Sequence, residues 1–72
     1  MEKRKIEEAY RLFSNALPSE KRLELARCSH IGEIMGLAER YNYPLSMDEC
    51  IGIYIMLAYP EYFNKLSPDA IV

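Results

Sequence analysis

Residues 50–59 read Cys-Ile-Gly-Ile-Tyr-Ile-Met-Leu-Ala-Tyr, ten consecutive positions without a charge. Ser46 and Glu49 lie just before them at the spacing of a capping box, which marks the start of a helix. A helix that is apolar on every side must be surrounded by protein or must offer one side to a partner. Because the chain has only 72 residues, little protein is available to surround this helix. We therefore expect one side of it to form a binding face.

The rest of the chain also has helical spacing of its apolar residues, and no segment alternates as a strand would. We predict helices over residues 3–16, 19–27, 30–41 and 46–58. A short last helix should run from Pro60 to residue 64 or 65, since proline suits the first position of a helix. Asn42 should end the third helix in a turn, because asparagine accepts the left-handed conformation. The sequence thus predicts an all-α fold, a compact bundle of four helices plus a short C-terminal fifth helix. It should form one domain over residues 1–72, with a loose tail at about 67–72.

Two details of the helix packing are also predicted. In the second helix Leu23 and Ala26 should face inward, while Leu25 falls to one side. In the third helix Gly32 and Gly36 are spaced for the close approach of a neighbouring helix, although this signal is weak outside membranes.

The binding face is predicted from the charges at the start of the fourth helix. Asp48 and Glu49 mark a wet side, and at 100° per residue that side continues through Gly52, Ile53, Met56 and Tyr59. The opposite side should pack on Phe13 and on the third helix, and it consists of Met47, Cys50, Ile51, Tyr54, Leu57 and Ala58. Exposed apolar patches usually mark interfaces. The alternative is that the second helix or the C-terminal tail covers the wet side. The predicted partner-binding residues are Ile53, Ile55, Met56, Tyr59, Tyr62 and Phe63.

The charge of the chain is unevenly distributed. Residues 1–27 carry seven basic and five acidic side chains, a net of +2, and residues 28–72 carry two basic and six acidic, a net of −4. An acidic half repels phosphate backbones, so nucleic-acid binding is disfavoured. We interpret the basic cluster Lys3-Arg4-Lys5 as a solvated first helical turn. The apolar run is too short to span a membrane, which needs about 20 residues.

The sequence contains no pattern that indicates catalysis. Cys28 and Cys50 lack metal-ligand spacing, and reduced buried thiols in a cytoplasmic protein are favoured over a disulfide, which the sequence leaves open. His30 is the only histidine and is interpreted as a capping-region or surface residue. No phosphate loop or metalloprotease motif occurs. We expect a protein that is not an enzyme and has no metal, cofactor or small-molecule substrate.

The segment from Phe13 to Glu49 resembles the Nif11-like family of small helical proteins and leader domains. The resemblance depends on apolar helix positions and on the turn before the fourth helix: Phe13, Leu23, Ala26, Ile34, Leu37, Ala38, Asn42, Tyr43, Leu45 and residues 46–49. The chain differs from the family at Asn42, where glycine is usual, in the absence of a double-glycine processing site, and in its more apolar fourth helix. The resemblance implies a docking domain that a larger enzyme recognises.

Three functions are weighed from the sequence. The first is a protein-interaction module that docks on a partner, or dimerises, through the fourth helix. The second is a small phage- or plasmid-type inhibitor or regulator of a larger enzyme. The third is a helix-turn-helix DNA-binding protein, which is disfavoured because the helix after Asn42 has no Arg, Lys, Asn or Gln before Tyr59 to contact bases or phosphates.

Overall fold

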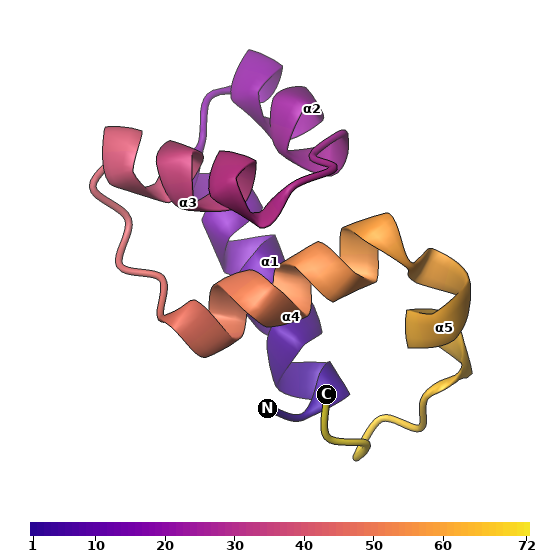
Figure 1. Ribbon diagram of the computed structural model, residues 1–72. Helices are drawn as coiled ribbons and strands as arrows, with labels where there is room; N and C mark the ends of the chain where they lie inside the picture. Colours follow the sequence, from indigo (N-terminus) through magenta and orange to yellow (C-terminus); the bar gives the residue numbers. More distant parts are fainter.

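The computed structural model describes residues 1–72 and contains five helices without a strand (Figure 1). They are α1 (Lys3–Ala16), α2 (Ser19–Ala26), α3 (Ile31–Arg40), α4 (Met47–Ala58) and α5 (Pro60–Lys65). The predicted all-α fold is confirmed. Each predicted helix is present, and its ends differ from the prediction by at most one residue.

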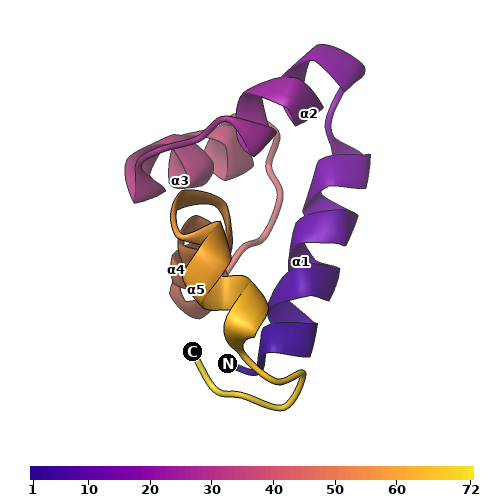
Figure 2. The same ribbon diagram turned by 90° about the vertical axis from the view of Figure 1, so that its right-hand side faces the viewer.

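Helix α4 lies at the centre of the molecule and packs against α1, α3 and α5. It crosses α1, whereas α2 and α3 pack together near the far end of α1 (Figures 1 and 2). This position follows from composition, because α4 is the most apolar of the helices and gains most from having several neighbours. The largest fully buried side chains come from all five helices: Phe13, Phe63, Ile6, Leu25, Ile34 and Ile53.

The turn between α3 and α4 is closed by backbone hydrogen bonds. Asn42 has a left-handed backbone, with φ of 53°, as its sequence context predicts. Its N–H donates to the carbonyl of Glu39 at 3.2 Å, and the N–H of Tyr43 donates to the carbonyl of Ala38 at 2.8 Å. These two bonds form a Schellman motif. The ring of Tyr43 then packs on Phe13 with centroids 5.0 Å apart, which holds the loop against α1.

The predicted capping box at the start of α4 is present. The N–H of Glu49 donates to Ser46 Oγ at 3.1 Å, and the N–H of Ser46 donates to Glu49 Oε1 at 2.8 Å. Leu45 precedes the cap and Cys50 follows four positions into the helix, the spacing of a hydrophobic staple. The capping box and the staple pair each involve residues within five positions of one another. They therefore determine where α4 begins without help from the rest of the fold.

The predicted inner side of α2 is wrong. Leu25 is fully buried, whereas Leu23 is 55% exposed and Ala26 is also exposed. Arg22 explains the orientation, because its Nε donates to two carbonyl oxygens at the end of α1, at 3.0 and 3.1 Å. The carbonyl of Ser14 also accepts from the N–H of Leu17, and Leu17 is the C-cap residue of α1. Arg22 thus ties α2 to the end of α1 in the rotation that buries Leu25.

The expected loose tail is wrong as well, since the last residues cap the start of α1. The N–H groups of Lys3 and Arg4 donate to the carbonyls of Ala70 and Pro68, at 2.8 and 3.3 Å. A further backbone bond of 2.9 Å joins the last residue to the first. The first N–H groups of a helix lack partners within it, and the C-terminal segment supplies them here.

The basic cluster at the start of α1 also holds this segment. Lys3 Nζ donates to the carbonyl of Leu66 at 2.9 Å and lies 5.4 Å from the centroid of the Phe63 ring. Arg4 lies 3.4 Å from the carboxylate of Asp69. Lys3 therefore departs from the predicted solvated turn, whereas Arg4, whose side chain is 67% exposed, and Lys5 match it.

Candidate functional site

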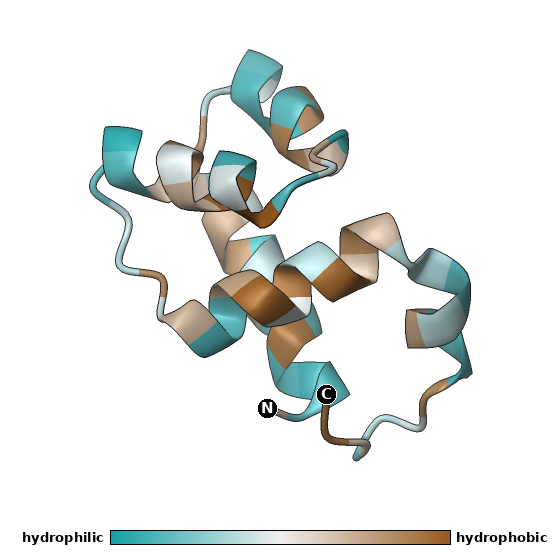
Figure 3. Cartoon of the chain, in the orientation of Figure 1, coloured by the Kyte–Doolittle hydropathy of each residue, from teal (hydrophilic) through white to brown (hydrophobic).

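Helix α4 is apolar on both of its sides, and one side is open to solvent. Figure 3 shows α4 coloured as hydrophobic over much of its length, while α5 is mostly hydrophilic. The inner side contributes Cys50 and Ile53 to the core, at 3% and 0% exposure. The outer side continues past the end of the helix, and we call it the α4 face: Met47, Ile51, Tyr54, Ile55, Ala58, Tyr59 and Tyr62.

The α4 face combines side chains that are about half exposed with side chains that are more deeply buried. Met47, Ile51, Tyr59 and Tyr62 are 54%, 41%, 56% and 57% exposed. The remaining three members are half-buried. Met47, Ile51, Tyr54, Ile55 and Ala58 follow the spacing i, i+4, i+7, i+8 and i+11, which places them on one stripe of the helix.

The predicted partner-binding residues are divided between this face and the core. Ile53 is fully buried and Phe63 is 1% exposed, so assigning these two residues to a binding surface is wrong. Met56 is half-buried on the inner half of α4 and does not belong to the face either. Tyr59 and Tyr62 are exposed on the open side. Ile55 lies on the same stripe of α4 but is half-buried and also packs against the core.

The rotation of α4 was predicted about half a turn from its true position. Asp48 and Glu49 do not mark the solvent side: both lie in the first helical turn, where negative charge interacts favourably with the helix dipole. Glu49 is also held by the capping box. Their charge therefore indicates where the helix begins and does not indicate which side of the helix faces water.

A glycine marks the side of α4 that faces the core. A Cβ atom added at Gly52 would lie 2.6 Å from Cδ1 of Ile6, so α4 and α1 approach each other closely at this point. Gly32 and Gly36 have no atom within 4 Å of such a Cβ, and the predicted close approach at α3 is wrong. A single glycine within an otherwise apolar helix was the signal that could have given the correct rotation.

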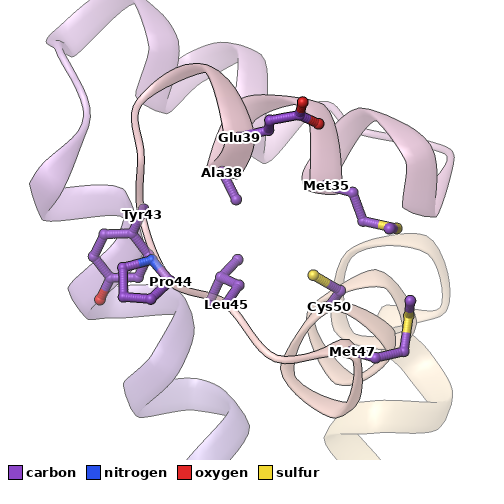
Figure 4. A pocket seen from close by; sticks show the side chains of 8 residues that line it. All are labelled: Met35, Ala38, Glu39, Tyr43, Pro44, Leu45, Met47 and Cys50. Atoms are coloured by element: carbon purple, nitrogen blue, oxygen red, sulfur yellow. The ribbon is translucent and has the colours of Figure 1, made fainter.

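A groove adjoins the α4 face where α3 meets the start of α4. It encloses about 240 Å³ and was not predicted from the sequence. Figure 4 shows the side chains of Ala38, Leu45 and Cys50 directed into it, with Met35 and Met47 together at one side. Met47 belongs to both the groove and the α4 face, so the two form one continuous apolar surface.

A second hollow lies at the other end of the face, at the corner between α4 and α5. It encloses about 370 Å³ and is lined by five consecutive residues, 58–62. Its walls come from one stretch of chain, so it is open and shallow. The rings of Tyr54 and Tyr59 meet edge to face beside it, with centroids 6.0 Å apart. Tyrosine offers both an apolar ring and a polar tip, as is typical of interfaces.

The surroundings of the α4 face are acidic. Residues 41–64 contain no Lys, Arg or His and three acidic residues, Asp48, Glu49 and Glu61. Glu39 lies on the groove at one end of the face, and Glu61 on the hollow at the other end. A partner would thus meet an apolar strip with negative charge at both ends.

Both cysteines are free and buried, at 4% and 3% exposure. Burial, together with the nearby carboxylates of Glu33 and Glu24, raises the pKa of Cys28 to about 11. Burial and the charge of Glu49 also raise the pKa of Cys50, which lines the groove. The thiolate is the reactive form of cysteine, so these thiols are poor nucleophiles at neutral pH.

The thiols should react slowly in the native protein. A pKa of about 11 in place of 9.0 lowers the thiolate fraction of Cys28 about 100-fold near neutral pH. We expect iodoacetamide to label both cysteines rapidly in denatured protein and more slowly in native protein, with labelling of native Cys28 slowed at least about 100-fold, as followed by peptide mass. Rapid native labelling of either cysteine would contradict the buried positions.

The same burial should make the protein less stable in alkali. The folded state favours the protonated thiol, whereas the unfolded thiol ionises near 9.0. The free energy of unfolding should therefore fall as the pH rises from about 9 to about 11. In Cys28→Ala the fall over this range should be smaller, because the thiol whose pKa is raised to about 11 is gone.

The other polar groups named from the sequence form no cluster. His30 is the exposed N-cap residue of α3 and makes no side-chain capping bond. No group of three or more His, Cys, Asp or Glu side chains lies close enough to hold a metal ion. None of the helices has both the length and the apolar content needed to cross a bilayer.

Comparisons with protein-family models, with curated proteins and with solved structures found no match for this chain. The resemblance to the Nif11-like family therefore stays a prediction.

Proposed function

We propose that this protein is a non-catalytic interaction module that binds a protein partner through the α4 face and the adjoining groove. The observation that carries the proposal is the exposure of four large apolar side chains along one surface: Met47, Ile51, Tyr59 and Tyr62. Fully burying a side chain of this size is worth about 1.5–3 kcal/mol. Because each of the four is roughly half exposed, each has about 1 kcal/mol to gain from a partner.

The residue types also support a role in binding. Methionine adapts to irregular surfaces, and tyrosine gives a large contact with little loss of conformational entropy. Methionines lie at the groove end of the face and tyrosines at the other end. The Nif11-like hypothesis points to the same class of role, a docking domain recognised by a larger enzyme. Two free, buried thiols suit a cytoplasmic setting, where disulfides are rare.

Paired variants test the α4 face directly. The full chain, carrying an affinity tag, is used to capture partners from an extract of its source cells. We expect Met47→Gln with Ile51→Gln to lose a captured protein that the unaltered chain retains. Leu23→Gln is the control. Leu23 lies on α2, away from the α4 face, and is 55% exposed, nearly the same as Met47 at 54%. Glutamine changes polarity without adding charge and is tolerated in helices.

The outcomes are distinct. Loss of capture only in the α4 variant supports the proposal, provided that circular dichroism gives the same helical content for all three proteins. If the captured protein is retained by the α4 variant, or if the Leu23 variant loses it equally, the α4 face is not the binding surface.

A further inference from the structure

The shape of the α4 face favours a helical partner. Helix α4 has 12 residues and is about 18 Å long, so an antiparallel or parallel helix of three turns would cover it. The chain has no strand whose free edge could accept an extended peptide. Binding must therefore use side chains, as when an amphipathic helix places its apolar side in a groove.

The two ends of the face can each accept an anchoring side chain. At the start of α4 the groove is lined by Ala38, Leu45 and Cys50 and flanked by Met35 and Met47 (Figure 4). Its volume of about 240 Å³ is below the roughly 300–1,000 Å³ of small-molecule sites and suits one or two side chains. The hollow at residues 58–62 lies beyond the other end of the helix.

The charge at these ends selects among helical partners. Glu39 borders the groove and Glu61 borders the hollow. The nearest cations in the sequence, Arg40 and Lys65, form no ion pair with either carboxylate. Charges of complementary sign at the rim speed association and exclude wrong partners. A partner with lysine or arginine on either side of its apolar stripe would meet both carboxylates.

A second copy of this chain fits the face poorly. Two α4 faces placed together would bring acidic residues against acidic residues. The basic half of the chain is partly occupied already, because Lys3 is bound to the carbonyl of Leu66 and Arg22 to carbonyls at the end of α1. Arg4, Arg11 and Lys21 form ion pairs within the chain.

We infer that the segment of the partner that binds the α4 face is an amphipathic helix with lysine or arginine residues flanking its apolar stripe. This inference rests on the proposed function and specifies the chemistry of the partner.

A matched pair of synthetic helical peptides tests the inference. Both have leucines at i, i+4, i+7 and i+11, and the flanking positions carry lysine in one and glutamate in the other. Each is titrated into the isotope-labelled full chain, and binding is followed by NMR. We expect the lysine peptide to shift the resonances of Met47, Ile51 and Tyr59 and to bind at least about tenfold more tightly than the glutamate peptide.

Neutralised variants locate the charge effect. Glu39→Gln with Glu61→Gln should weaken binding of the lysine peptide about fivefold to tenfold and reduce its salt dependence. Glu7→Gln with Glu20→Gln is the control, because it removes two exposed, unpaired carboxylates from α1 and α2 and leaves the α4 face unaltered. The control should bind as the unaltered chain does.

Three results would overturn the inference. If both peptides bind the face equally, charge does not select the partner, although the face itself remains a docking surface. If neither peptide shifts the α4 resonances, a flanked helix is not the partner, and the capture experiment with Met47 and Ile51 variants then decides the proposed function separately. If the same resonances shift on dilution of the protein alone, a second copy occupies the face.

Discussion

Ile53→Ala should lower the free energy of unfolding by about 3–4 kcal/mol. Ile53 is fully buried on the inner side of α4, and truncating a buried isoleucine to alanine removes its transfer free energy and leaves a cavity. A domain of 72 residues has a total stability of roughly 4–11 kcal/mol. The variant should therefore be close to unfolded at room temperature or have a much lower denaturation midpoint in urea.

Ile51→Ala is the matched control for this prediction. Ile51 has the same side chain on the same helix, two positions away, but is 41% exposed. We expect its loss of stability to stay below about 1 kcal/mol, since little cavity forms and alanine favours the helix. Urea titrations followed by circular dichroism give both values. Similar losses for the two variants would show that the rotation of α4 described above is wrong.

Gly52→Ala should destabilise the protein by up to about 2 kcal/mol, although alanine is the better helix former. The added Cβ would lie 2.6 Å from both Cδ1 and Cγ1 of Ile6 and 3.2 Å from its Cγ2. Ile6 is fully buried, so its side chain can give way only by displacing its neighbours in a close-packed core. Overpacking of this kind costs about 1–3 kcal/mol, which exceeds the gain of about 1 kcal/mol in helix propensity.

Gly36→Ala is the matched control for Gly52→Ala. A Cβ at Gly36 meets no atom within 4 Å, so only the gain in helix propensity remains. We expect Gly36→Ala to raise the free energy of unfolding by about 0.5–1 kcal/mol. The two glycine variants should thus change thermal stability in opposite directions.

Shortening Ile6 should reveal the contact. In the double variant Gly52→Ala with Ile6→Ala, all three Ile6 atoms that meet the new Cβ are absent, so the combined loss should be smaller than the sum of the single losses. Strict additivity, or a stabilising effect of Gly52→Ala alone, would contradict the close approach of α1 and α4.

The helices themselves could be predicted from the sequence because their signals are local. The capping box of Ser46 and Glu49, the left-handed Asn42 and the first-turn position of Pro60 all involve residues within a few positions of each other. Such signals act through nearby backbone groups and hold whatever the rest of the chain does. The excess of apolar surface on α4 was also predictable, since it is a matter of composition.

The rotation of each helix was decided by tertiary contacts. Leu25 is buried because Arg22 reaches the end of α1, and the C-terminal segment is ordered because it supplies carbonyls to the first turn of α1. Neither set of hydrogen bonds has a sequence signal. Every backbone carbonyl can accept a hydrogen bond, and only folding brings these particular donors and carbonyls together.

Helix α4 has apolar residues on both of its sides, so its hydrophobic pattern does not indicate which side faces the core. The sequence alone determined five helices and an excess of apolar surface on the fourth. The close approach of Gly52 to Ile6 selected which side would face the core, and thereby placed Met47, Ile51 and Tyr59 in solvent. Steric fit between two helices far apart in the chain is a property of the tertiary structure, since it depends on how closely their backbones can pack.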